Sequence, residues 1–143
     1  MQFGIMTVGD VSTDPTTGRT PTEHERIKAT VEIAKLADEV GLDVFAVGQH
    51  HNPPFVASSP TTTLAWIGAQ TKNIILSTST TLITTTDPVR IAEDYGMLQH
   101  LTDGRMDLML GRGRNGAQLL ELGKELAIFS PTDYQCCTSL RAA

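Results

Sequence analysis

The chain is poor in cysteine, in aromatic residues and in long apolar runs, and each scarcity removes a class of protein. Its two cysteines, Cys136 and Cys137, are adjacent, which is no disulfide framework. Aromatic residues make up only 5% of the chain, so the core must be built mainly from aliphatic side chains. No apolar run approaches the roughly 18 residues of a membrane span. The composition therefore predicts no membrane partner.

Positive charge is also scarce, because 11 Lys and Arg face 16 Asp and Glu for a net charge of −5. The basic residues are dispersed, so we expect no nucleic-acid partner. Residues Met1–Val8 lack the basic start and the long apolar middle of a signal peptide. We therefore expect a cytoplasmic protein, and 40% hydrophobic residues are enough for a core.

What the sequence does have is an alternation of short apolar strands and amphipathic helices. Strands are expected near residues 2–8, 42–48, 74–82 and 106–111. The last three begin at residues 42, 74 and 106, a step of 32 residues, which is about one βαβ unit. This rhythm predicts an α/β fold with a parallel sheet, either open and doubly wound or closed into an eight-stranded barrel.

Capping residues place the helices between these strands. Thr20 followed by Glu23 has the spacing of a capping box, and Gly41 is a typical helix stop. Ser59-Pro60 starts a second helix, expected to run to about Thr71, and Asp87-Pro88 starts a third. The first helix carries two apolar stripes that together predict a wide buried face: Ile27, Val31 and Ala34, with Ala29, Ile33, Leu36 and Val40 beside them.

One expected strand ends in the stretch Val47-Gly-Gln-His-His-Asn-Pro-Pro-Phe55. Parallel α/β folds place their active residues at the carboxyl ends of strands. Neighbouring residues of a strand face opposite sides, so His50 and His51 cannot both bind one metal ion, and no cysteine lies at useful spacing. We expect no metal site. His50 is expected to face a cavity at the strand ends and His51 to point away from it.

Two further stretches lie at expected strand ends. Gly111-Arg-Gly-Arg-Asn-Gly116 has the spacing of a dinucleotide-binding turn. Three strand–helix units precede it, however, whereas that turn belongs to the first unit, so the nicotinamide interpretation is disfavoured. Arg112 still offers a cation for an anionic group. Ser77–Thr81 is a run of small hydroxyl residues, which suits a strand and also lets a flat ring lie close to the backbone.

In order along the chain, these pieces resemble the amino-terminal half of a luciferase-like flavin-dependent monooxygenase. The matching stretches are Val47-Gly-Gln-His-His51, Ser58-Ser-Pro60, Ser79-Thr-Thr81, Thr86-Asp-Pro-Val-Arg90, Ile91-Ala-Glu-Asp94, Asp103-Gly-Arg105 and Gly111-Arg-Gly113. The resemblance implies a TIM-barrel-type (β/α)8 fold. A complete barrel takes roughly 250 residues. We therefore expect only its first half, about four βα units, over residues 1–113, followed by a divergent tail over residues 114–143 with one helix at 117–126 and an irregular end.

The resemblance also implies an activity and its partners. The expected protein is a flavin-dependent oxidoreductase or monooxygenase that uses reduced FMN, or else a deazaflavin coenzyme, and O2 on a small organic substrate. A flavin reductase is a further candidate partner. Members of the family typically form dimers, so a homo-oligomer is expected. The alternative is a truncated, non-catalytic half-barrel that binds flavin weakly or serves only as an association module.

The family's site residues carry over to a few positions. The resemblance implies that His50 is the catalytic residue, lies by the isoalloxazine ring and takes part in proton transfer. It also implies that Ser79 and Thr80 lie against the ring, often through a non-proline cis peptide, and that Arg112 with Gly113 completes the cofactor site. Many relatives have Glu where this chain has Gln49, whose amide can hydrogen-bond but cannot titrate.

Overall fold

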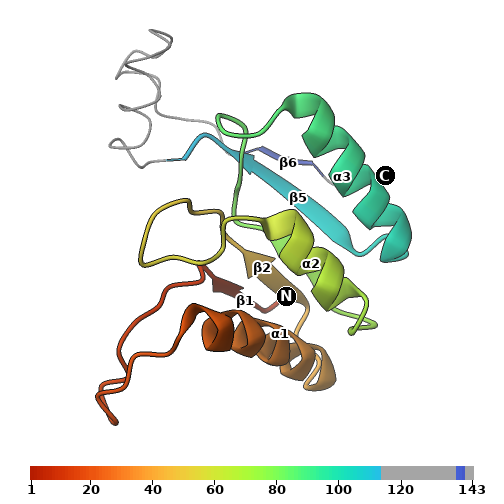
Figure 1. The fold of residues 1–143 in the computed structure, drawn as a ribbon. Coiled ribbons are helices and arrows are strands. Elements are labelled where there is room, and N and C mark those ends of the chain that lie inside the picture. Colours follow the sequence, from red (N-terminus) through yellow and green to blue (C-terminus); the bar gives the residue numbers. More distant parts are fainter. Residues whose placement is uncertain (114–137, 141–143) are drawn as a thin grey trace, which may run out of the picture.

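The computed structural model describes residues 1–113 and the backbone of residues 138–140 (Figure 1). Its strands are β1 (Gly4–Thr7), β2 (Val44–Val47), β3 (Ile75–Thr78), β4 (Thr81–Leu82), β5 (Met106–Gly111) and β6 (Thr138–Leu140). Its helices are α1 (Glu23–Glu39), α2 (Pro60–Gly68) and α3 (Pro88–Leu101). The expected helix at 117–126 lies outside the described residues. No helix of the described part is both long and apolar enough to cross a membrane.

The sheet is parallel, as the 32-residue rhythm predicts. β1 pairs with β2, β2 with β3 and β3 with β5, all in parallel, with Val47 of β2 opposite Thr7 on one side and Thr78 on the other. The expected strand at 74–82 is in fact two strands, because regular strand structure is interrupted at Ser79 and Thr80, between β3 and β4. β4 then pairs with β5 in parallel as well, through Thr81 opposite Leu110.

β6 is the one antiparallel strand of the described sheet. Leu110 pairs with Thr81 on one edge of β5 and with Thr138 on the other. The irregular end expected for the tail is therefore wrong for residues 138–140. An outer strand offers a row of backbone donors and acceptors, and an extended segment satisfies them.

The three helices lie on one face of the sheet (Figure 1). The core between helices and sheet is aliphatic apart from Phe45 and Tyr95, and it comprises Val31, Ala34, Ala37, Phe45, Val47, Ala57, Leu64, Ile67, Ile74, Leu76, Ile91, Tyr95, Leu98 and Met106. Since strand residues alternate, Ala46 and Ser77 lie on the opposite face. That face would line the interior of a barrel.

Helix α1 begins two residues later than the sequence predicted. Its N-cap is Thr22, whose hydroxyl accepts from the Glu25 N–H at 3.2 Å, while the Glu25 carboxylate accepts from the Thr22 N–H at 2.8 Å. The hydroxyl of Thr20 instead bonds Thr13 in the preceding loop at 2.8 Å. Thr20 and Thr22 can both cap a helix, and here Thr20 bonds within the loop while Thr22 caps α1. Helix α2 also ends early, at Gly68 rather than near Thr71.

The buried face of α1 is narrower than its two apolar stripes predicted. Val31, Ala34 and Ala37 are buried, whereas Ile33, Leu36 and Val40 are 43%, 57% and 66% exposed. Ile27, from the other stripe, is also 45% exposed. Ala34 and Ala37 are 0% and 3% exposed, so small side chains, rather than most of the large apolar ones, form the buried face of this helix. Helix α3 follows its prediction, with Ile91, Tyr95 and Leu98 buried together.

Candidate functional site

The carboxyl ends of β2, β3 and β5 meet around the peptide between Ser79 and Thr80. That bond is cis, as the resemblance led us to expect, and it lies in the break between β3 and β4. Gly48 flanks it on one side, where an added Cβ would stand 3.0 Å from the Ser79 carbonyl oxygen. Gly111 flanks it on the other, where an added Cβ would stand 2.2 Å from the Thr80 hydroxyl. A side chain at Gly111 would collide with Thr80, and one at Gly48 would force the neighbouring atoms to shift by a few tenths of an ångström.

This arrangement leaves a shelf of backbone with no Cβ projecting from either neighbouring strand at those positions. The Ser79 N–H donates to the Val47 carbonyl at 2.9 Å, which ties the shelf to β2. The Ser79 hydroxyl lies 2.9 Å from the sulfur of Met6, two strands away. A planar ring can rest on such a surface, so the residues present fit the ring of a flavin. The sequence indicated this site through its small hydroxyl residues and glycines.

His50 follows the end of β2 and is half-buried. Its imidazole stacks on the ring of Phe55, with 4.3 Å between the ring centroids and 24° between the planes. Its backbone N–H donates to the Ala57 carbonyl at 3.0 Å. The loop that begins at the two prolines thus returns to hold the histidine. Sequence reasoning missed Phe55, although it stands at the end of the stretch that was singled out.

Gln49 is a second residue that sequence reasoning left out of the site. It is buried, with 7% of its surface exposed. Its amide oxygen accepts from the Leu82 N–H at 2.9 Å, and its amide nitrogen lies 2.8 Å from Nε2 of His51 and 3.3 Å from the Thr85 hydroxyl. His51 is thus held by a side chain that also binds the segment after the cis peptide. The alternation argument for His51 does not apply, because β2 ends at Val47.

Arg112 and Gly113 follow the end of β5. The Arg112 carbonyl accepts from the Thr84 hydroxyl at 2.9 Å. An added Cβ at Gly113, which has φ +77°, would stand 3.1 Å from Leu82. Both residues are therefore packed against the segment that follows Thr80. The structure brings Thr80, Gly111 and this turn together, whereas the convergence of the Arg112 guanidinium with His50 stays a prediction.

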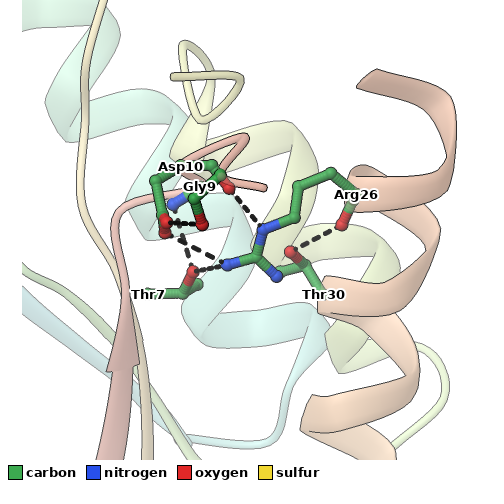
Figure 2. Close-up of polar contacts among 6 residues, drawn as sticks. Thr7, Gly9, Asp10, Arg26 and Thr30 are labelled. Carbon is green, nitrogen blue, oxygen red and sulfur yellow. Dashed lines mark hydrogen bonds and ion pairs between the residues drawn. The ribbon is translucent and has the colours of Figure 1, made fainter. Parts of the chain in front are cut away.

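A partly buried ion pair stands at the end of β1 (Figure 2). Nε of Arg26 donates to the Asp10 carbonyl at 2.7 Å, and its terminal nitrogen donates to the Thr7 hydroxyl at 3.1 Å and lies 3.4 Å from the Asp10 carboxylate. The hydroxyl of Ser12, followed by the Asp10 backbone and Arg26, holds the pKa of Asp10 below its ordinary value in spite of partial burial. Sequence reasoning did not single out this pair.

A groove lies among the helices and reaches Gln49. It is open, it is also lined by Lys28, Trp66, Met97 and Leu101, among others, and it includes none of the predicted site residues. Within residues 1–113, no group of three or more His, Cys, Asp or Glu side chains is placed to hold a metal ion.

Known structures share this arrangement of strands and helices. The oxygenating constituent of 3,6-diketocamphane monooxygenase from Pseudomonas putida, a type II Baeyer–Villiger monooxygenase solved in complex with FMN, matches with a TM-score of 0.73 and 22% identity. The match covers 86% of this chain and 32% of that one. The fold expectation is confirmed: the described residues form the first part of a (β/α) barrel.

Curated relatives agree in sequence. N-acetyl-S-alkylcysteine monooxygenase of Bacillus subtilis is 32% identical over 103 residues, which are 71% of this chain and 31% of the relative. The oxygenase component of flavin-dependent trigonelline monooxygenase of Acinetobacter baylyi is 27% identical over 93 residues, 64% of this chain and 26% of the relative. The chain thus spans less than a third of the length of these two relatives.

The match to a family profile covers more of the chain than either relative does. Residues 1–128 match the luciferase-like monooxygenase family. The match extends past the predicted boundary at Gly113. With such a match over most of its 143 residues, the chain belongs to the luciferase-like monooxygenase family.

Proposed function

We propose that this chain forms the ring-binding half of a flavin-dependent monooxygenase site, which uses reduced FMN and O2 on a small organic substrate. The observation that carries the proposal is the Ser79-Thr80 peptide, flanked by Gly48 and Gly111 at neighbouring strand ends. The flavin-dependent oxygenase among the relatives supports a flavin as the cofactor. Its description as an oxygenase component also supports a flavin reductase as partner.

Each residue then has a separate task. The cofactor supplies the redox chemistry and the reaction with O2. The backbone of Ser79 and Thr80 holds the flat ring, and Gly48 and Gly111 make room for that segment between the neighbouring strand ends. His50 holds and moves a proton on its imidazole beside the ring. Arg112 carries a permanent positive charge for the anionic phosphate of the cofactor.

The test separates ring binding, phosphate binding and turnover. We would titrate the full chain with FMN, with riboflavin, which lacks the phosphate, and with a deazaflavin coenzyme. O2 uptake would then be measured with an added flavin reductase and a panel of small organic substrates. FMN binding with substrate-dependent O2 uptake supports the proposal. Absence of any flavin binding by the folded chain overturns it, and binding of the deazaflavin alone shows that the cofactor is wrong.

Two substitutions assign the roles within that test. His50→Ala should lower turnover by about 10²- to 10⁴-fold, the usual contribution of a general acid or base, with little change in flavin affinity. Arg112→Ala should reduce the preference for FMN over riboflavin, because only FMN carries the phosphate. Arg90→Ala is the matched control, since Arg90 is 63% exposed on α3 and pairs there with Glu93 and Asp94. If His50→Ala leaves turnover unchanged in a flavin-loaded chain, the role of His50 is wrong.

A second candidate function is a non-catalytic association module. Ile33, Leu36 and Val40 form an exposed apolar stripe on α1, and exposed stripes of this kind mark interaction surfaces. A self-associating chain that binds no flavin in light-scattering and titration measurements would favour this function. A stable monomer that binds FMN would rule it out.

A further inference from the structure

We propose that Arg26 is a positioning residue for His50, and that it fixes the imidazole from helix α1 through Asp10 and Phe55. The inference rests on the proposed function, because it concerns the placement of the catalytic candidate. Arg26 does not belong to the candidate site residues, and the proposal is that it acts on His50 through intervening residues.

The first step is the hold of Arg26 on the segment after β1. Its side chain is 19% exposed and reaches from α1 to the main chain of Asp10, to the Asp10 carboxylate and to the Thr7 hydroxyl (Figure 2). The Gly9 N–H also donates to the Thr7 hydroxyl, at 3.1 Å. A planar guanidinium with a fixed fork of donors fixes its acceptors in one geometry. Residues 7–10 are therefore clamped to α1.

The second step joins that segment to the loop after β2. Asp10 and Phe55 form an antiparallel bridge. Beside it, the Val11 N–H donates to the Pro54 carbonyl and the Val56 N–H donates to the Gly9 carbonyl, each at 2.8 Å. This short ladder sets the position of Phe55 relative to β1. The two loops can also be followed side by side in Figure 1.

The third step is the contact of Phe55 with His50. The phenyl ring stacks on the imidazole, with 4.3 Å between the ring centroids and 24° between the planes, and such a stacked contact restricts the orientation of the imidazole. The same loop accepts the His50 N–H through Ala57 at 3.0 Å. Both the backbone and the ring of His50 are thus fixed by residues whose position depends on the clamp. A displacement of a reacting group by about 1 Å can lower the rate about 100-fold, so the position of the imidazole matters for catalysis.

The test reads the His50 ring directly. In the chain with isotope-labelled histidine, the four histidines are assigned by single substitutions, and the ring-proton resonances of His50 are compared between variants. Phe55→Leu should move them toward unstacked values, because the ring current is removed. Arg26→Lys should move them part of the way in the same direction, since a single ammonium nitrogen cannot span the acceptors that Nε and a terminal nitrogen of Arg26 reach separately. His24 and His100 should keep their resonances and serve as internal references.

Two further variants keep the test decisive if Arg26→Lys folds poorly. Thr7→Val removes one anchor of the guanidinium and preserves the shape of the side chain, so it should give a smaller shift of the same sign. Arg90→Lys, in an exposed ion pair on α3, should give none. If Arg26→Lys or Thr7→Val folds and leaves the His50 resonances unchanged, the proposal is overturned and Arg26 merely stabilises its own loop.

Kinetics separates this inference from the proposed function. In a flavin-loaded chain, Arg26→Lys should lower kcat by about tenfold with a smaller change in flavin affinity. Phe55→Leu should do the same, and the double variant should be little worse than either single one, because both act through one contact. Full additivity would contradict the shared route. If the resonances shift as expected but no flavin binds, the positioning stands and the proposed function fails.

Discussion

The two ends of the parallel sheet are built from different chemistry. At the amino end, charged side chains bind the main chain. The Arg105 guanidinium donates to the carbonyls of Gly68, Thr71 and Ile74 at 3.0–3.1 Å, and the Asp38 carboxylate accepts backbone N–H groups at 2.7–2.9 Å. At the carboxyl end, glycines and small hydroxyl residues surround the Ser79-Thr80 peptide, and within the described residues Arg26 binds main chain only beside β1, at Asp10.

This difference separates stability from function. Charged groups at the amino end satisfy buried backbone atoms and lock the connections between helices and strands. Glycines at the carboxyl end give up side-chain contacts and let the Ser79-Thr80 segment pack between the neighbouring strand ends. In α/β barrels the catalytic residues likewise come from the carboxyl ends of strands, while the opposite face serves stability. Substitutions at the two ends should therefore have separable effects.

The largest effect on stability is expected from Arg105→Met at the amino end. The substitution leaves carbonyls of Gly68, Thr71 and Ile74 without their donor, and an unsatisfied buried group costs about 1–3 kcal/mol. We expect the free energy of unfolding to fall by about 3 kcal/mol or more in urea denaturation, with flavin affinity of the folded fraction unchanged. Arg90→Met is the exposed control. A loss below about 1 kcal/mol would contradict the assigned role of Arg105.

Gly111→Ala should give a mixed effect at the carboxyl end. The new Cβ would stand 2.2 Å from the Thr80 hydroxyl, so Thr80 must move, and overpacking of this kind costs about 1–3 kcal/mol. Flavin affinity should fall together with stability, because the shelf itself shifts. Gly96→Ala, in α3 with no atom within 4 Å of the new Cβ, is the control and should be neutral or stabilising. Unchanged flavin affinity in Gly111→Ala would separate the shelf from the cofactor site.

Asp38→Asn should show a smaller, pH-dependent effect at the amino end. Burial raises the pKa of Asp38. Hydrogen bonds from the backbone N–H groups of Lys72, Asn73 and Ile74, together with the charge of Arg105, outweigh this effect and bring the pKa below its ordinary value of 3.8. A carboxyl group with a lowered pKa in the folded state stabilises the protein fully at pH values above its pKa in the unfolded state. This stabilisation is lost as the pH falls through its pKa in the folded state. The stability gap between the two proteins should therefore be widest at neutral pH and shrink below pH 4. A gap independent of pH would show that packing, not charge, is responsible.

Glu25→Gln, at the other end of the same helix, should have the smallest effect. The Thr22 N–H, then Arg19 and the Thr22 hydroxyl, lower the pKa of Glu25 from 4.5 to about 2. The Glu25 side chain is 42% exposed, so solvent weakens its interactions. Its contribution should be complete above pH 4.5 and be lost as pH falls toward 2. Thermal melts of the two proteins should converge in that range. A difference larger than that of Asp38→Asn would reverse the comparison between the two ends.

Much of the fold was predictable, because local signals agree with the tertiary structure. Asp87-Pro88 starts α3 as expected, and its buried residues Ile91, Tyr95 and Leu98 lie at helical spacing. The predictions failed where two nearby residues could both cap a helix, and where the exposure of a side chain depends on which other elements pack against it. Thr20 and Thr22 both have capping chemistry, and only the contact between Thr20 and Thr13 decides between them. The exposure of Leu36 depends on which elements pack on α1, which its own spacing does not contain.

The candidate site divides in the same way. His50, Ser79, Thr80, Arg112 and Gly113 were found from residue types at strand ends and from the family resemblance. The tie of Arg26 to Asp10 spans 16 positions, and the contact of Gln49 with Leu82 spans 33. No local pattern marks such pairs.

By itself, the sequence determined the parallel βα order, the family and the residue types at the strand ends, since these follow from period, capping residues and motif order. Only the tertiary structure decided the break between β3 and β4, the stack of Phe55 on His50 and the clamp of Arg26. The physical reason is that these features arise from contacts between segments far apart in the chain. Their energies depend on distances and angles of a few ångströms and degrees, which only the assembled fold sets.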